Sequence, residues 1–255
     1  MTAVRTLEER GGSWLRIVLD RPRGNLLSLE MVRALAAALA SAASARPKWA
    51  TIEGAGSEFS FGAMIQEHVP GPMEQVLQEM HAMLRQILAM PCATAALVEG
   101  RCLGAGFEVA LACDLVIATE DATLGLPEIG LAAFPPAGAA LLPLRVGASR
   151  AAEAVLTGTA RSAARWHAEG VVSMVAPAGR LIDSARDWFD QNLAPRSQVA
   201  IAAAAAATRL TVRAAAEPAI AAAERFYLDR ILPTDDAAEG VRAFIEKRPP
   251  QWKGH

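Results

Sequence analysis

The stretch from residue 93 to residue 114 predicts a strand, a tight turn and the start of a helix in direct succession. Residues 93–98 (ATAALV) form an apolar run that breaks at residues 99–100 (EG). The small residues 104–106 (GAG) follow, and the apolar residues after them recur with helical spacing. This local order is typical of proteins that mix strands and helices around one core.

The start of this predicted helix has the properties of an anion-binding site. The first helical turn leaves backbone N–H groups without partners, and the helix dipole favours negative charge there. Small residues let a ligand approach the backbone closely. Glu108 lies three residues after Ala105, on the same helix face. A carbonyl oxygen bound by the Ala105 N–H would therefore lie near the Glu108 carboxylate, which needs a partner or a shifted pKa when buried.

Other interpretations of these residues remain open. A turn of small residues before a helix often only relieves packing, and a Glu in a first turn often only complements the dipole. A dinucleotide-binding turn is disfavoured because its third glycine is replaced by Val109. A second carboxylate, Glu128, follows Pro127 in a short apolar context, and it could be an ordinary loop residue.

Three motifs in order resemble the enoyl-CoA hydratase/isomerase (crotonase) family. They are residues 59–63 (FSFGA), 99–118 (EGRCLGAGFEVALACDLVIA) and 124–131 (LGLPEIGL). The resemblance extends from Ile17 to the tail at 239–252. It implies an α/β fold, a crotonase-like spiral of ββα units over residues 1–190. It further implies a C-terminal helical trimerisation region over residues 191–255, with assembly as a homotrimer or dimer of trimers.

The resemblance also implies the catalytic groups. Ala63 and Ala105 match the two positions whose backbone N–H groups form an oxyanion hole for the thioester carbonyl. Glu108 and Glu128 match the two glutamates of the family's hydratases, with Glu108 activating water and Glu128 supplying a proton. The pair favours water addition to an acyl-CoA thioester. No metal and no separate cofactor is expected, since CoA arrives as part of the substrate.

Several positions depart from the family's usual pattern. Ala105 stands where Gly is usual, Met64 where Asp is frequent, and Phe61 where a small residue is usual, so Phe61 and Met64 are expected to influence substrate choice. The loop motif and the tail FIEKRPPQW look most like the branch that hydrates cyclohexa-1,5-diene-1-carbonyl-CoA. Alternatives are a general enoyl-CoA hydratase, an isomerase or hydrolase of the family, or a non-catalytic CoA-thioester-binding relative.

Three cationic or aromatic residues are candidates for holding CoA. Arg23 follows the first strands and could meet a CoA phosphate, although a solvated loop arginine is an alternative. Phe244 and Lys247 match residues that in the family hold adenine or phosphates, often of a neighbouring subunit, although Lys247 could simply complement a helix C-terminus. His68 could touch the substrate, although a position on a surface loop is favoured, and His81, inside a predicted helix, has no assigned role.

Composition excludes several other classes. The net charge of −2 and the pI of about 6.1 give no attraction to nucleic acid or to an anionic membrane. No apolar run is evident that is long enough to cross a bilayer, and no G-x-S-x-G serine-hydrolase motif occurs. Cys92, Cys102 and Cys113 lack metal-site spacing, and the first residues lack secretion features. The expected location is the cytoplasm.

The remaining pattern predicts the order of elements. A hairpin is expected at 4–19, a helix at 29–44 capped by Ser28, a strand at 49–52, an irregular stretch at 65–72 and an amphipathic helix at 73–89. Further expectations are strands at 115–118, 122–124 and 171–175, short helices at 149–158 and 162–169, and helices only from about residue 177, including the alanine run at 202–207.

Overall fold

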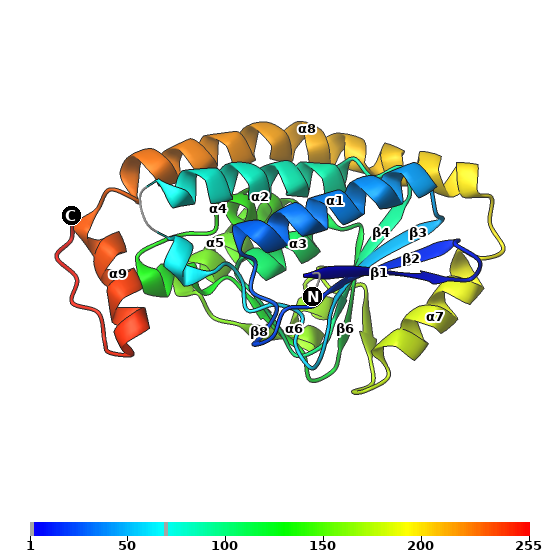
Figure 1. The fold of residues 1–255 in the computed structure, drawn as a ribbon, viewed down its shortest axis with the longest axis horizontal. Coiled ribbons are helices and arrows are strands. Elements are labelled where there is room, and N and C mark those ends of the chain that lie inside the picture. The colour runs from blue at the N-terminus through cyan, green and yellow to red at the C-terminus, as the bar shows by residue number, and fades with distance from the viewer. Residues whose placement is uncertain (1–2, 69–70) are drawn as a thin grey trace.

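A six-stranded sheet lies at the centre of the fold, with strand order β1-β2-β3-β4-β6-β9. We describe it from a computed structural model that covers residues 3–68 and 71–255 (Figure 1). β1 and β2 pair antiparallel, and every later neighbour pairs parallel. The strands are β1 (Val4–Glu9), β2 (Trp14–Leu19), β3 (Trp49–Gly54), β4 (Ala93–Val98), β6 (Leu115–Thr119) and β9 (Met174–Ala176).

A second, smaller sheet contains the strands nearest the candidate site. Its order is β5-β7-β8, formed by β5 (Arg101–Leu103), β7 (Thr123–Gly125) and β8 (Arg161–Ser162). Successive repeats add one strand to the large sheet, one to the small sheet and then one helix, as in β4-β5-α3 and β6-β7-α4. This ββα repeat confirms the α/β spiral.

Helices connect and cover the strands. They are α1 (Leu29–Ala45), α2 (Pro72–Leu88), α3 (Ala105–Ala112), α4 (Pro136–Val146), α5 (Ala148–Thr157), α6 (Ala163–Ala168), α7 (Leu181–Asn192), α8 (Gln198–Arg230) and α9 (Asp235–Glu246), with short 3₁₀ turns η1 (Ile65–Glu67) and η2 (Pro127–Leu131). Ser28 caps α1 by accepting a hydrogen bond from the Met31 N–H, as the sequence predicts.

Both faces of the large sheet are covered at its centre, which explains why β2, β3 and β4 are buried almost throughout. Leu15, Ile17 and Leu19 point to the face that packs against α1. Trp14 points to the opposite face and packs with Trp49 and Phe189 of α7. Alternation along β2 therefore sends successive side chains into two different apolar layers.

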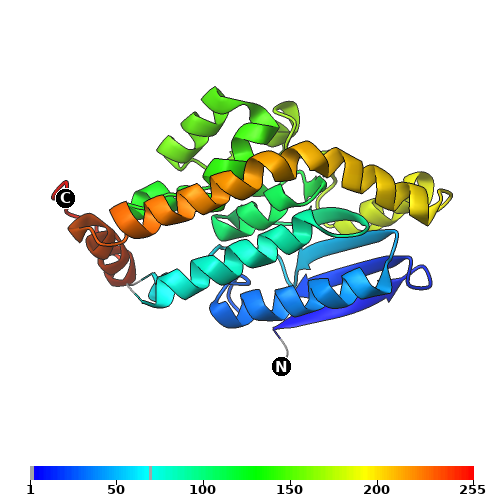
Figure 2. The same cartoon turned by 90° about the horizontal axis from the view of Figure 1, so that it is seen from above.

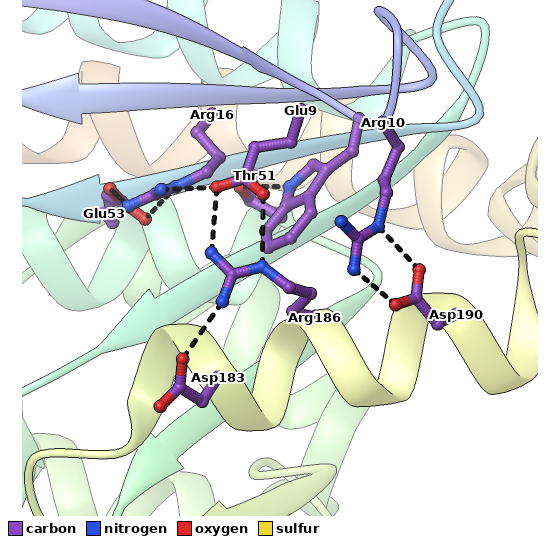
Figure 3. Close-up of polar contacts among 9 residues, drawn as sticks. Glu9, Arg10, Arg16, Thr51, Glu53, Asp183, Arg186 and Asp190 are labelled. Carbon is purple, nitrogen blue, oxygen red and sulfur yellow. Dashed lines mark hydrogen bonds and ion pairs between the residues drawn. The ribbon is translucent and has the colours of Figure 1, made fainter.

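Ion pairs fasten α7 to the edge of this sheet (Figure 3). Arg186 of α7 contacts Glu9 of β1, and Arg10 forms a two-pronged pair with Asp190. Arg16 of β2 bridges Glu9 and Glu53. These pairs attach α7 to the antiparallel part of the sheet through side chains.

α8 runs along nearly the whole molecule and packs against α2 and α4 (Figure 2). Its side chain Arg209 is 4% exposed and binds Asp114, at the end of α3, together with the Met90 and Cys92 carbonyls. The sequence was expected to contain no apolar segment long enough to cross a bilayer. This expectation is corrected, because α8 is long and apolar enough to cross one by length and composition. Ala216 and Ile220 of α8 lie in the main apolar cluster.

The element boundaries match the predictions with a few differences. The sequence missed β5, and the strand expected at 171–175 is limited to β9, with Val171 and Val172 buried before it. The stretch expected to be irregular at 65–72 contains η1 and the first residue of α2, and residues 69 and 70 lie outside the described residues. The division at residues 190/191 stays a prediction.

We expect Arg209→Ala to lower the free energy of unfolding by about 3 kcal/mol, because it leaves the Asp114 charge without its buried partner. Arg213 of the same helix pairs with Glu217 at the exposed surface, so Arg213→Ala should cost less than about 1 kcal/mol. Urea unfolding at one fixed protein concentration measures both. Equal losses in the two variants would contradict the structural role of Arg209.

Candidate active site

Two backbone segments meet at the carboxyl end of β5 and form the floor of the site. The loop at 59–63 pairs with β5 through a bridge between Ser60 and Cys102. Gly106 of α3 lies so close to Ser60 that a Cβ on it would stand 2.7 Å from the Ser60 Cβ. Ser60 in turn holds the loop, because its hydroxyl donates to the Asn25 carbonyl and accepts from the Gly62 N–H.

The N–H groups of Ala63 and Ala105 are available at this floor. The Leu27 N–H binds the Gly62 carbonyl and the Met64 N–H binds the Leu27 carbonyl, so the Ala63 N–H points away from that bridge. Ala105 is the first residue of α3, where an N–H has no helical acceptor. Within the described residues neither N–H has a partner, and both residues line one cavity.

Glu108 is buried in α3 and held by the start of the next helix. Its Oε1 accepts a hydrogen bond of 2.7 Å from the Gly138 N–H, in the first turn of α4. Burial raises the pKa of Glu108 above its ordinary value, although His81 and the Gly138 and Ala137 N–H groups act to lower it. At the other end of this helix pair, Arg145 of α4 binds the Leu111 and Cys113 carbonyls at the end of α3.

Glu128 approaches from η2 and lies against the turn before α3. A Cβ on Gly104 would stand 2.7 Å from its Oε1, and Gly104 adopts a φ of +53° that suits glycine. Its Oε2 is buried and has no hydrogen-bond partner within the described residues. Burial, reinforced by the Glu108 charge, raises the Glu128 pKa to about 8.

The two carboxyl groups therefore have different environments. Glu108 has hydrogen-bond donors from a helix start, which stabilise its ionised form, whereas the Glu128 carboxyl has only its own backbone N–H as a donor among the described residues. A single negative charge on the pair thus belongs on Glu108, with the proton on Glu128. This is the arrangement that a base and an acid in one site require at neutral pH.

The cavity that contains both carboxyl groups is small and mostly apolar. Its volume is about 40 Å³, and its lining includes Ala63, Ala105, Glu108 and Glu128. The apolar lining comes mainly from α2 and its neighbours: Leu27, Val32, Met73, Val76, Leu77 and Met80. In residues 3–68 and 71–255 no three His, Cys, Asp or Glu side chains group as a metal site would need.

His68 is a site residue that sequence reasoning missed. It was expected on a surface loop, but it lines this cavity, its Nε2 is buried without a partner in the described chain, and burial lowers its pKa to about 4. The apolar helix that follows could have indicated the error, because Met73, Val76 and Leu77 pack inward beside it.

The candidate CoA-binding residues fall into two groups. Arg23 and Phe61 lie together in a groove of about 450 Å³ between residues 20–25 and 55–61, and the Phe61 ring stacks under Arg101 at 4.1 Å. Phe244, 58% exposed, and Lys247 lie on and just after α9, apart from this groove and from the cavity. Met64 begins η1 and lines neither.

The chain is similar to known proteins over almost its whole length. The family model for enoyl-CoA hydratase/isomerase matches residues 9–255. A cyclohexa-1,5-dienecarbonyl-CoA hydratase of Thauera aromatica is 35% identical, with 96% of this chain and 95% of that protein covered. A carnitinyl-CoA dehydratase of Salmonella arizonae is 34% identical, with 96% and 97% covered.

Solved structures agree with this assignment. The crystal structure of an enoyl-CoA hydratase from Mycobacterium avium subsp. paratuberculosis superposes with a TM-score of 0.83 at 29% identity, covering 98% of each chain. The fold predicted from the three motifs is confirmed by this match.

Glu128 should make stability depend on pH. In the folded protein its pKa of about 8 lies above the ordinary value of 4.5. The stabilisation that protonated Glu128 gives to the folded state is therefore complete below about pH 4.5 and is lost as pH rises through 8. Glu128→Gln mimics the protonated form without titrating. The variant's unfolding free energy relative to the parent should therefore rise by up to about 1.4 kcal/mol per pH unit in that window.

Urea unfolding between pH 5 and 9 tests this dependence, with the exposed Glu217→Gln as the matched control. A flat difference between the Glu128→Gln variant and the parent would show that Glu128 titrates normally.

Proposed function

Because this chain belongs to the enoyl-CoA hydratase/isomerase family, we propose that it is a hydratase that adds water to a conjugated acyl-CoA thioester. One observation carries the proposal: two free backbone N–H groups and two unequal carboxyl groups line a single cavity. Relatives of this chain are hydratases and dehydratases, so the chemistry is that of a hydro-lyase.

The N–H groups of Ala63 and Ala105 bind the thioester oxygen. Negative charge grows on this oxygen as water adds to the conjugated carbon, and fixed donors stabilise that charge without reorganising. The helix start at Ala105 adds the favourable end of the α3 dipole. No metal and no cofactor other than the CoA of the substrate enters the proposal.

The two carboxyl groups move the protons. Glu108, ionised, removes a proton from water while the water oxygen bonds to the unsaturated carbon. The electron pair of the double bond moves toward the thioester oxygen, and Glu128 then gives its proton to carbon. The starting charge distribution, anion on Glu108 and proton on Glu128, follows from the environments described above.

The acyl group that we favour is a compact alicyclic diene, as in cyclohexa-1,5-diene-1-carbonyl-CoA. A small cavity with an apolar wall suits a flat ring better than a polar chain. The relative from Thauera aromatica is named as a hydratase of that thioester. His68 and the apolar residues of α2 would contact the ring, whereas Phe61 with Arg23 would lie along CoA in the groove.

We further propose that the enzyme works in the cytoplasm as a homotrimer or a dimer of trimers. Large apolar side chains are exposed on α5 and α8, including Leu156, Val199, Leu210 and Phe226, and contact with neighbouring subunits would bury them. In an assembly, Phe244 and Lys247 would reach CoA bound to a neighbouring subunit.

Mass-resolved turnover tests the reaction. Given cyclohexa-1,5-diene-1-carbonyl-CoA and crotonyl-CoA separately, the protein should add one water to the diene. Glu128→Gln should lower the rate by about 10²- to 10⁴-fold because the proton donor is removed, while Glu217→Gln should not change it. An adduct from crotonyl-CoA would indicate a general enoyl-CoA hydratase, and binding without any adduct would refute the hydratase proposal.

Ala105→Pro tests the oxyanion hole. Proline is favoured at a first helical position, so α3 should keep its structure while losing one donor. We expect kcat to fall by about 10²- to 10³-fold, whereas Ala105→Gly, which keeps the N–H, should stay close to the parent. Circular dichroism checks that the variant folds. Undiminished kcat in the proline variant would remove Ala105 from the hole.

A further inference from the structure

His68 lies where two cavities of the molecule meet. It lines the catalytic cavity of about 40 Å³ together with Ala105, Glu108 and Glu128. It also lines a groove of about 450 Å³ along α9. Among residues 3–68 and 71–255, no other residue lines both spaces. The imidazole therefore stands between the reacting groups and the groove.

The groove beyond His68 is apolar, like the catalytic cavity. Leu232 of this groove belongs to the same apolar cluster as Met73, Val76 and Leu77, which line the cavity. An aliphatic chain that passed the imidazole would thus remain in apolar surroundings. The apolar residues that line the groove are Leu232, Pro233, Ala237, Ala238, Val241 and Ile245.

α9 is fixed beside the element that carries Glu128. Gly240 of α9 packs so closely on η2 that a Cβ there would collide with the Leu131 carbonyl. In Figures 1 and 2, α9 lies beyond the end of the molecule at which α2 begins. The groove is therefore held next to the catalytic cavity by direct packing of α9 on η2.

The backbone that carries His68 is also fixed. Glu67 accepts a hydrogen bond of 3.1 Å from the Leu29 N–H, at the first residue of α1. The positive end of the helix dipole favours a carboxylate at this place. The His68 N–H donates to the Ile65 carbonyl, which closes the η1 turn. Because η1 is attached to α1 in this way, the imidazole has a defined position between the two spaces.

The imidazole is uncharged at neutral pH. Burial lowers the pKa of His68 to about 4, and within the described residues its Nε2 has no hydrogen-bond partner. A cationic ring beside an apolar acyl group would have to lose its hydration, whereas a neutral ring packs against carbon at lower cost. What the side chain presents to both spaces is therefore mainly its volume.

We propose that His68 is a specificity-determining residue that closes the far end of the acyl pocket and restricts this enzyme to compact acyl groups. The inference rests on the proposed hydration and deepens it, because it names the residue that selects the substrate class. A longer acyl chain needs the space that the imidazole occupies, and the groove along α9 receives that chain once the space is open. The class that His68 excludes is the straight-chain enoyl thioester of medium length.

Turnover as a function of acyl length tests this role. Cyclohexa-1,5-diene-1-carbonyl-CoA and trans-2-decenoyl-CoA are compared in the parent and in His68→Ala. The ratio of kcat/KM for the decenoyl thioester to that for the diene should rise by about 10- to 100-fold in the variant, because the opened pocket accepts the additional methylenes. An unchanged ratio would overturn the proposal. His68→Ser opens the same space and serves if His68→Ala does not fold.

Two further variants separate volume from chemistry and locate the acyl chain. His68→Leu keeps a side chain of similar size without ring nitrogens, so it should keep the ratio of the parent. Ala238 is exposed on α9 and lines the groove. Ala238→Trp should fill the groove and reverse the gain of His68→Ala, whereas Ala238→Trp alone should not change turnover of the diene. A gain in His68→Leu equal to that in His68→Ala, or a gain that Ala238→Trp does not reverse, would refute the proposal.

A binding measurement distinguishes this inference from the proposed reaction. Decanoyl-CoA and butyryl-CoA have no conjugated double bond to hydrate, so their Kd values from titration calorimetry report on the pocket alone. The Kd of decanoyl-CoA should fall about tenfold in His68→Ala as more methylenes are buried, while that of butyryl-CoA should stay close to the parent value. No fall would overturn the inference even if the diene is hydrated. If decanoyl-CoA binds more tightly while no thioester is hydrated, the proposed function fails and the role of His68 stands.

Discussion

The parallel contact between α3 and α4 is the interaction on which the site depends. At one end the carboxylate of α3 lies on the N–H groups that open α4, and at the other the Arg145 guanidinium of α4 covers the carbonyls that close α3. Each helix thus satisfies the terminal groups of the other, where unpaired buried groups would be costly. Because both ends of α3 are fixed, its first N–H, that of Ala105, lies beside Gly62 in the loop that carries Ala63.

Two residues of one chemical type acquire opposite roles from their surroundings alone. Glu108 lies among backbone donors, whereas Glu128 lies against a glycine turn with a buried oxygen that no described group binds. Because like charges in a dry cavity oppose double ionisation, the protons belong to the pair as a whole. Packing around the pair therefore determines the chemistry as much as the residue types do.

Much of this could be predicted from local patterns. Helical spacing, the Ser28 cap and the small-residue turn at 104–106 gave the elements, and the order of three motifs gave the family and the carboxylate positions. What failed depends on distant segments. β5 is only three residues long and exists through pairing with β7, and His68 is half-buried in a cavity whose other lining residues include side chains of α2, which begins after it. The burial of His81 could not be interpreted from the sequence, because its partner Glu224 lies 143 residues later, in α8.

Two side chains of α8 contact the part of the fold that carries the site. Arg209 binds Asp114, just after α3, and Glu224 contacts His81 of α2. These positions are 15 residues apart, roughly 22 Å along a helix. The outward face of the same rod is rich in alanine and is exposed. Because both contacts lie on one rod, a shift of α8 along its axis would displace Arg209 and Glu224 together. The packing of α3 and that of α2 are thereby coupled through a helix that contributes no residue to the cavity lining described above.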